Sequence, residues 1–223
     1  MDYKVITNPE NPLYGKSYEE VLEMVKKDFS NFQYVQQQTS ELCLAAVQQN
    51  GRVLRSVKEQ TPEICLAAVQ RNGDSLWYVK QQTPEICMAA VKQDGYALQF
   101  VKEQTPEICL AAVQQNAGTL PFVKQQTPEI CVAAVMRNGW TLGYVKEQTH
   151  ELCLAAVRQS GWALQLVKNQ TLEICLAAVQ QNGWVIQHIK EQTLKICLAA
   201  VQQNRWALQF VWDEFYEEVK ASL

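Results

Sequence analysis

The sequence predicts an all-α solenoid (a superhelix) of nine helical hairpins of 22 residues each, the first of them degenerate. Eight cysteines and eight threonines each recur at intervals of 22 residues, and the threonines run from Thr39 to Thr193. Each repeat holds two segments with helix signals, separated by a polar turn. No segment alternates apolar and polar residues with the period of two that strands require. A fixed period of this size is typical of solenoids, in which each repeat buries its apolar faces on its neighbours.

The chain is expected to divide into four segments. These are an extended N-terminal segment (residues 1–16), a capping repeat (17–38), eight full repeats (39–214) and a C-terminal helical extension (215–223). In the capping repeat Ser17 stands in the place of Thr, and charged residues replace apolar or neutral ones, as suits a repeat with one face toward water. A hydrophobic fraction of 48% in 223 residues excludes an intrinsically disordered chain.

The first helix of each repeat has clear start and stop signals. Thr61 is a typical N-cap, Pro62 suits the first helical position, and Glu63 favours the first turn. An apolar body follows from Ile64 to Val69, so the helix is expected to be covered by neighbours on most sides. We expect it to end at Asn72-Gly73, with the glycine in the left-handed conformation.

The second helix is expected to span about eight residues, for example 96–104, with a lysine in its last turn where it favours the helix dipole. Helices this short are not stable alone, so packing between repeats must hold them. Residues 215–223 are expected to extend the last of these helices.

The repeated cysteines are interpreted as small buried apolar residues. There is no C-x-x-C pair, which argues against zinc, and equivalent cysteines of adjacent repeats should lie roughly 9 Å apart, beyond the span of a disulfide. The sequence also contains no Ser/His/Asp set, glycine-rich phosphate loop or H-E-x-x-H motif. We therefore expect no enzymatic activity, no catalytic residue, no cofactor and no metal site.

The net charge of −3, from 20 basic and 23 acidic side chains, argues against a dedicated nucleic-acid binder. The longest apolar run is six residues, so no contact with the membrane interior is expected. Unpaired thiols favour a reducing, intracellular location.

The pattern L-A-A-V-x-Q-N-G-x-A-L-x-(Y/F) is seen in part from Leu110 to Asn116 and most fully from Leu176 to Ile186. This pattern resembles the helical-hairpin repeats called domain of unknown function 4116, which occur in tandem in bacterial effector-like, phage and large-virus proteins. The resemblance extends from Ser17 to about Trp212 and transfers no catalytic residue. It implies an interaction module in the cytoplasm of a bacterium or an infected host cell.

The positions that vary between repeats are the candidate partner-binding residues, because repeat proteins specialise at exposed positions on a constant frame. They include a row of aromatic residues, which could pack between the second helices or form an interaction hot spot. The candidates are Trp77, Tyr96, Met136, Arg137, Trp140, Tyr144, Arg158, Trp162, Trp184, His188 and Trp206.

These observations favour a non-enzymatic scaffold that binds and blocks a host protein, as a phage or bacterial effector or inhibitor. The alternative is a binder of a small anionic nucleotide or of single-stranded nucleic acid in the solenoid groove. The partner's identity and the oligomeric state are left open by the sequence.

Overall fold

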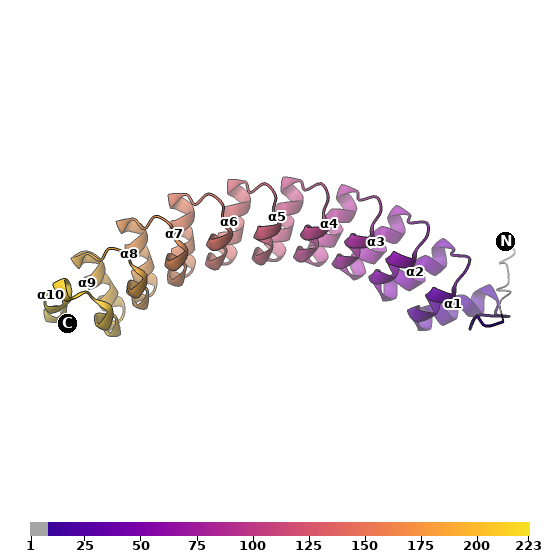
Figure 1. The fold of residues 1–223 in the computed structure, drawn as a ribbon, viewed down its shortest axis with the longest axis horizontal. Coiled ribbons are helices and arrows are strands. Elements are labelled where there is room, and N and C mark those ends of the chain that lie inside the picture. Colours follow the sequence, from indigo (N-terminus) through magenta and orange to yellow (C-terminus); the bar gives the residue numbers. More distant parts are fainter. Residues whose placement is uncertain (1–8) are drawn as a thin grey trace. The chain divides into compact units, whose positions relative to one another are not determined.

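A computed structural model of the chain describes residues 9–223 (Figure 1). These residues form ten α-helices, labelled α, and nine 3₁₀ helices, labelled η, and they contain no strand. The predicted helical-repeat solenoid is therefore confirmed. The chain divides into two compact units, the first ending at Asn116 and the second running from Ala117 to Leu223. Within residues 9–223, none of the helices has the length and apolar character needed to cross a bilayer.

The first unit contains the capping repeat, three full repeats and the α-helix of the next. Its α-helices lie side by side in chain order, each packed on the next (Figure 1). Its elements are α1 (Tyr18–Lys27), η1 (Phe29–Tyr34), α2 (Ser40–Gln49), η2 (Gly51–Ser56), α3 (Pro62–Arg71), η3 (Gly73–Tyr78), α4 (Pro84–Gln93), η4 (Gly95–Phe100) and α5 (Pro106–Gln115).

The second unit has the same construction and ends in an additional α-helix. Its elements are η5 (Ala117–Phe122), α6 (Pro128–Arg137), η6 (Gly139–Tyr144), α7 (His150–Gln159), η7 (Gly161–Leu166), α8 (Leu172–Gln181), η8 (Gly183–His188), α9 (Leu194–Gln203), η9 (Arg205–Phe210) and α10 (Asp213–Ala221).

The α-helices begin where the sequence predicts. The Thr61 hydroxyl accepts a hydrogen bond from the Ile64 backbone N–H at 3.3 Å, and the same cap recurs in the other full repeats. In α3 the side chains of Cys65 and Ala68 are buried, together with their apolar neighbours. The alanine is fully buried because its small side chain lets the adjacent helices approach closely.

The second helices differ from the prediction, because each is a 3₁₀ helix of six residues rather than an α-helix of eight. η4 begins at Gly95 and ends at Phe100, so Lys102 lies beyond it and not in its last turn. A 3₁₀ helix rises about 2.0 Å per residue and an α-helix about 1.5 Å, so six residues of the former span as much as eight of the latter. The six-residue 3₁₀ helix therefore covers the same distance as the eight-residue α-helix that the sequence predicts.

The glycines that follow six of the α-helices also differ from the expected left-handed cap. Among the described residues only Gly15 has a positive φ, and Gly73 is the first residue of η3. A Cβ added at Gly73 would lie 2.8 Å from the Ala90 carbonyl oxygen of the next repeat. Glycine is required there because the chain passes the neighbouring helix at very short range.

Side-chain amides join consecutive repeats. Gln82, the last residue of its repeat, donates its Nε2–H to the Phe100 carbonyl at 2.9 Å, and its Oε1 accepts from the Lys102 backbone N–H at 3.0 Å. These two bonds join the segment around Gln82 to the end of the 3₁₀ helix in the next repeat. The same bridge to the following repeat is made by Gln60, Gln126, Gln148, Gln170 and Gln192.

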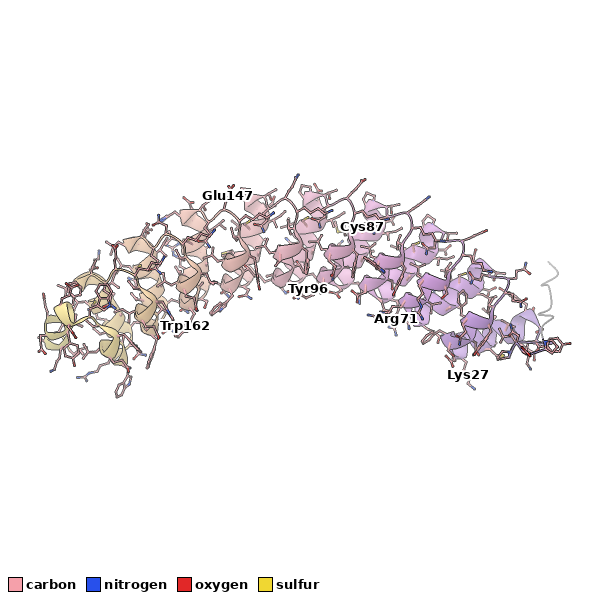
Figure 2. All side chains as sticks on the ribbon, viewed as in Figure 1. Lys27, Arg71, Cys87, Tyr96, Glu147 and Trp162 are labelled. Carbon is pink, nitrogen blue, oxygen red and sulfur yellow. The ribbon has the colours of Figure 1, made fainter. Side chains whose placement is uncertain are left out.

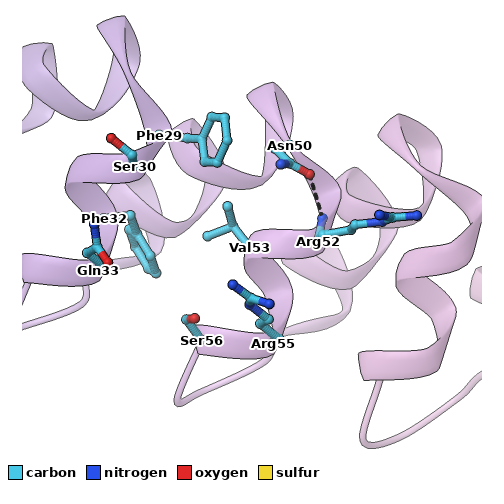
Figure 3. A pocket seen from close by; sticks show the side chains of 9 residues that line it. All are labelled: Phe29, Ser30, Phe32, Gln33, Asn50, Arg52, Val53, Arg55 and Ser56. Carbon is cyan, nitrogen blue, oxygen red and sulfur yellow. Dashed lines mark hydrogen bonds between the residues drawn. The ribbon is translucent and has the colours of Figure 1, made fainter.

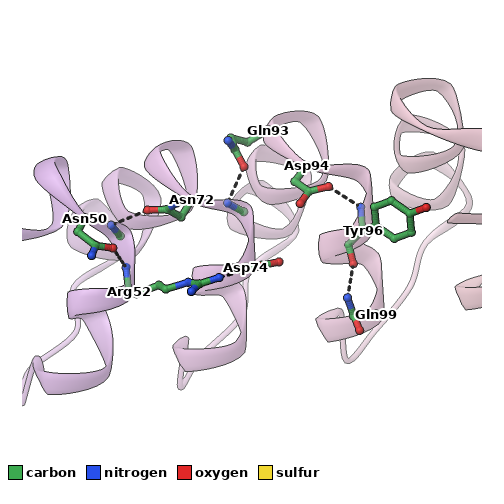
Figure 4. Close-up of polar contacts among 10 residues, drawn as sticks. Asn50, Arg52, Asn72, Asp74, Gln93, Asp94, Tyr96 and Gln99 are labelled. Atoms are coloured by element: carbon green, nitrogen blue, oxygen red, sulfur yellow. Dashed lines mark hydrogen bonds and ion pairs between the residues drawn. The ribbon is translucent and has the colours of Figure 1, made fainter. Parts of the chain in front are cut away.

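A second row of bonds joins the starts of the 3₁₀ helices (Figure 4). The Gly73 N–H donates to Gln93 Oε1 of the next repeat at 2.6 Å. One repeat earlier Arg71 occupies the glutamine position, and the Gly51 N–H donates instead to Asn72 Oδ1 at 2.9 Å. The amide side chains thus satisfy backbone groups at the corners between the helices.

Both ends of the repeat array differ from the expectations. Residues 1–8 lie outside the described residues, and residues 9–15 form turns that bury Leu13 completely rather than an extended segment. At the other end, Trp212 has an extended backbone and α10 begins afresh at Asp213, so the last residues form a separate helix and do not prolong η9.

Candidate functional site

The variable positions recur every 22 residues, so equivalent side chains are expected on the same side of a unit. In the first unit Lys27, Arg71 and Tyr96 lie on the same side (Figure 2). In the second unit Trp162 lies on the side opposite Glu147. The predicted residues of the second unit belong to η6 to η9 and to the ends of α6 and α7, and we call them the aromatic face: Met136, Arg137, Trp140, Tyr144, Arg158, Trp162, Trp184, His188 and Trp206.

Several members of the aromatic face are strongly exposed. The exposed fractions are 46% for Trp140, 55% for Tyr144, 62% for Met136 and 76% for Trp206. The backbone beneath them is fixed: the Trp140 N–H donates to Asn138 Oδ1 at 3.0 Å, and Leu142 of the same 3₁₀ helix is fully buried. Large apolar side chains are thus held toward solvent on a rigid support.

Other members pack against the next repeat. The Trp162 and His188 rings meet edge to face with centroids 5.5 Å apart, and Trp184 and Phe210 repeat this arrangement at 5.5 Å. The tryptophans of these pairs are half-buried. The packing interpretation therefore holds for some members of the aromatic row, which fill the spaces between 3₁₀ helices, whereas other members remain exposed.

The aromatic face lacks acidic side chains. Between residues 117 and 210, no position equivalent to those of Met136, Arg137, Trp140 or Tyr144 carries Asp or Glu. Arg158 is exposed and makes no hydrogen bond or ion pair with any residue from 9 to 223. The exposed Arg158 and the absence of Asp and Glu from these positions give this surface a positive character, despite the negative net charge of the chain.

The two predicted residues of the first unit have a different setting. Trp77 is 68% exposed, although one edge of its ring contacts Phe100 with centroids 5.5 Å apart. The N–H of Tyr96 donates to Asp94 Oδ1 at 2.9 Å (Figure 4). Nearby, Arg52 pairs with Asp74 at 3.2 Å, so this side of the first unit mixes both signs of charge.

The cysteines are free and buried, as predicted. Cys87 donates its S–H to Gln82 Oε1 at 3.6 Å, which links the cysteine row to the bridging glutamines. Burial raises the pKa of the thiols, to about 11 for Cys43, Cys175 and Cys197. No cluster of three or more His, Cys, Asp or Glu side chains suited to a metal ion occurs among residues 9–223.

The repeated lysines on the opposite edge bind the backbone. Lys80 donates from Nζ to the Lys58 carbonyl at 2.8 Å, and Lys102 does the same to Lys80 at 3.3 Å. Lys146 and Lys190 make the equivalent bonds in the second unit. The row therefore holds adjacent connecting segments together.

A cavity of about 270 Å³ between η1 and η2 lies outside the predicted site. Its signal in the sequence is a pair of serines, Ser30 and Ser56, at positions that carry rings or larger side chains in most of the other repeats. Substitution of small residues at ring positions is thus a mark of such a cavity.

Comparison with known proteins gives one result. The family described as Domain of unknown function (DUF4116) matches at residues 61–105, 83–126, 149–195 and 171–215, which together cover more than half of the chain. No curated protein and no solved structure gives a significant match. The matched segments span whole helical repeats, in phase with the hydrogen-bonded rows described above, and the chain belongs to the DUF4116 family.

Proposed function

We propose that the protein is a non-enzymatic scaffold that binds a protein partner through the aromatic face of the second unit. One observation carries the proposal: the constant residues of the repeat are used for packing and hydrogen bonding, whereas variable aromatic residues stay exposed on a rigid support. The packing of the repeats does not explain why large rings are exposed at Trp140, Tyr144 and Trp206.

The composition of the aromatic face suits protein recognition. Trp, Tyr and Arg are the residues that most often dominate binding energy at interfaces, and an exposed methionine adapts to irregular partner surfaces. Because carboxylates are missing from these positions, a partner surface with acidic residues around an apolar centre fits best. An effector or inhibitor role, in which binding blocks a host protein, is the part of the proposal that comes from the family resemblance.

The test uses the double substitution Trp140→Ala and Tyr144→Ala in the full chain. Both side chains are about half exposed, so helical content by circular dichroism should be unchanged. Proteins captured from lysate by the wild type should include at least one whose recovery falls about tenfold or more with the double variant, as expected when hot-spot residues are truncated. Glu147→Gln, on the opposite side of the unit, is the matched control and should retain that partner.

Loss of helical content in the double variant would show that these rings are core residues and would contradict the proposal. Binding to nucleic acid is the competing outcome, favoured by the same tryptophans and arginines. It would appear as capture that is abolished by nuclease and falls steeply with salt, because phosphate contacts release counterions.

A further inference from the structure

The cavity between η1 and η2 is lined by both apolar and polar side chains and has a cationic rim (Figure 3). Phe32 and Val53 are buried and form its floor, and Phe29, 37% exposed, forms one side. The cavity measures about 270 Å³, which is small for a drug-sized ligand and suits a single ring with a short substituent. It lies wholly within the first unit and apart from the aromatic face.

The origin of this cavity is visible in the repeat pattern. In the second unit Trp162 packs on His188, and Trp184 packs on Phe210, each pair joining one repeat to the next. Ser30 and Ser56 occupy the equivalent pair of positions, so neither ring is present. Ser30 and Ser56 both line the cavity. The space is therefore the one that two aromatic side chains fill elsewhere in the array.

The rim of the cavity carries a positive charge, that of Arg55, which no other described residue pairs with. Arg55 lines the cavity, is exposed, and makes no hydrogen bond or ion pair with the part of the chain that the structure describes. Its guanidinium lies on the cavity side of η2, whereas that of Arg52 points away toward Asp74 (Figure 3). No Asp or Glu is among the lining residues. An anionic group in the cavity would thus meet the Arg55 cation, while the neighbouring Asp28 carboxylate is already held by the Ser30 backbone N–H at 2.8 Å.

We propose that this cavity binds an aromatic ring that carries a carboxylate on a short linker. The ring replaces the pair of missing side chains against Phe32 and Val53, and the carboxylate pairs with Arg55, whose planar guanidinium can donate two parallel hydrogen bonds to it. The hydroxyls of Ser30 and Ser56 supply further donors. Such a group is found in free aromatic acids and at the end of a peptide chain that terminates in phenylalanine.

The test is a nuclear magnetic resonance titration of the full ¹⁵N-labelled chain with three probes. 3-Phenylpropionate carries both ring and carboxylate, 3-phenyl-1-propanol keeps the ring without the charge, and butyrate keeps the charge without the ring. 3-Phenylpropionate should shift amide signals within residues 29–56 and bind at least about fivefold more tightly than the alcohol, as expected for a hydrogen-bonded charge at a partly exposed site. Butyrate should bind more weakly still.

Two variants locate the interaction. Arg55→Gln should remove the preference for the acid over the alcohol, and Arg71→Gln, which deletes a charge on the next repeat and restores its usual residue, should leave it unchanged. The double variant Ser30→Trp and Ser56→Phe restores the ring pair and should abolish binding of 3-phenylpropionate. If that variant does not fold, the Arg55→Gln result decides alone.

Equal affinity for the acid and the alcohol would overturn the proposal, as would amide shifts confined to residues outside 29–56 or unchanged acid preference in Arg55→Gln. A fourth probe, acetyl-Gly-Gly-Phe with a free carboxylate, separates the two sources of the ligand. Tighter binding than 3-phenylpropionate identifies a peptide terminus, and equal or weaker binding identifies a free aromatic acid; each requires the same ring and carboxylate chemistry.

Discussion

Gln82 contacts three neighbours with one amide: it reaches two carbonyls of different repeats and accepts from a backbone N–H. The thiol of Cys87 donates to the same oxygen at 3.6 Å. A residue used in this way cannot be exchanged without leaving several buried groups unpaired, which costs more than the bond itself contributes. This explains why glutamine precedes the threonine of every repeat from Thr39 onward.

Ser75 is the exception among the buried polar side chains. It is completely buried, and its hydroxyl is the one buried side-chain N or O atom without a hydrogen-bond partner among the described residues. Equivalent positions carry Ala97, Ala163 and Ala207. We predict that Ser75→Ala raises the free energy of unfolding by about 1 kcal/mol, because an unpaired buried hydroxyl is removed. Urea denaturation followed by circular dichroism measures the change.

Thr141 provides the comparison for that measurement. It occupies the same place in its repeat and is nearly as buried, but its hydroxyl donates to the Asn138 carbonyl at 2.8 Å. Thr141→Ala should therefore lower the free energy of unfolding by about 1 kcal/mol or more. Destabilisation by Ser75→Ala would mean that its hydroxyl has a partner after all.

The buried thiols give a second prediction at this scale. The reactive species is the thiolate, and burial raises the pKa of Cys43, Cys175 and Cys197 from 9.0 to about 11. In the native protein all eight cysteines should react with a thiol reagent at pH 8 much more slowly than in 8 M urea, a rate followed by mass spectrometry. Rapid labelling of several of them without denaturant would contradict their burial.

At the scale of the element, the sequence predicts the α-helices well and the second helices only in part. Thr61, Pro62 and the apolar run after them are local signals, and local signals set where a helix begins. The choice between α and 3₁₀ geometry depends on the distance that the chain must cover before the next repeat, which no short segment encodes. The need for glycine at position 73 is likewise not visible in the local sequence, because it depends on close contact with Ala90 of the next repeat.

A substitution at Gly73 tests this account. The Cβ of Gly73→Ala would lie 2.8 Å from the Ala90 carbonyl oxygen, closer than real contacts allow, so η3 and α4 must move apart. We predict a loss of about 2 kcal/mol in the free energy of unfolding, measured by urea denaturation, as for overpacked cores.

Gly143 is the control for Gly73 because it also belongs to a 3₁₀ helix but has room for a Cβ. A Cβ there would make ordinary contact with the Leu166 side chain at 3.5 Å. Gly143→Ala should change the free energy of unfolding by less than about 0.5 kcal/mol or raise it slightly. Equal losses at the two glycines would show that backbone flexibility, and not contact with the next repeat, explains the first.

At the scale of the whole molecule, the fold consists of neighbour contacts repeated along the chain, and such arrays tolerate changes in repeat number. Removal of residues 61–82, one complete repeat, would place Gln60 before Thr83, and Gln60 could then bond to the end of η4 as Gln82 does in the intact chain. We predict that this deletion variant remains helical and unfolds cooperatively in urea, with a lower midpoint.

Loss of helical signal beyond the share of the removed repeat would contradict that prediction. A deletion of 11 residues, 61–71, is the control, since it removes one helix and breaks the phase of every later bond. This variant should lose stability far more than the longer deletion.

The candidate site is less predictable than the fold. The sequence identifies which positions vary, and a period of 22 residues returns equivalent side chains, such as those of Trp140 and Trp162, to equivalent places on successive 3₁₀ helices. Exposure does not follow from sequence: Trp162 is half-buried and Trp140 is exposed in the same repeat position. The difference arises from the following repeat, which supplies a ring for Trp162 to pack against in His188.

An array whose every repeat fits the next has no intrinsic reason to stop, and head-to-tail surfaces of this kind build open-ended fibres. In this chain the last 3₁₀ helix begins with Arg205, where six earlier 3₁₀ helices begin with the glycine that allows close approach, and α10 packs on α9. A Cβ at the equivalent Gly73 would meet a carbonyl oxygen of the next α-helix at 2.8 Å. We therefore expect the exposed Arg205 to oppose head-to-tail packing of a second molecule at this face, much as charged residues protect the edge strands of β-sheet proteins from aggregation.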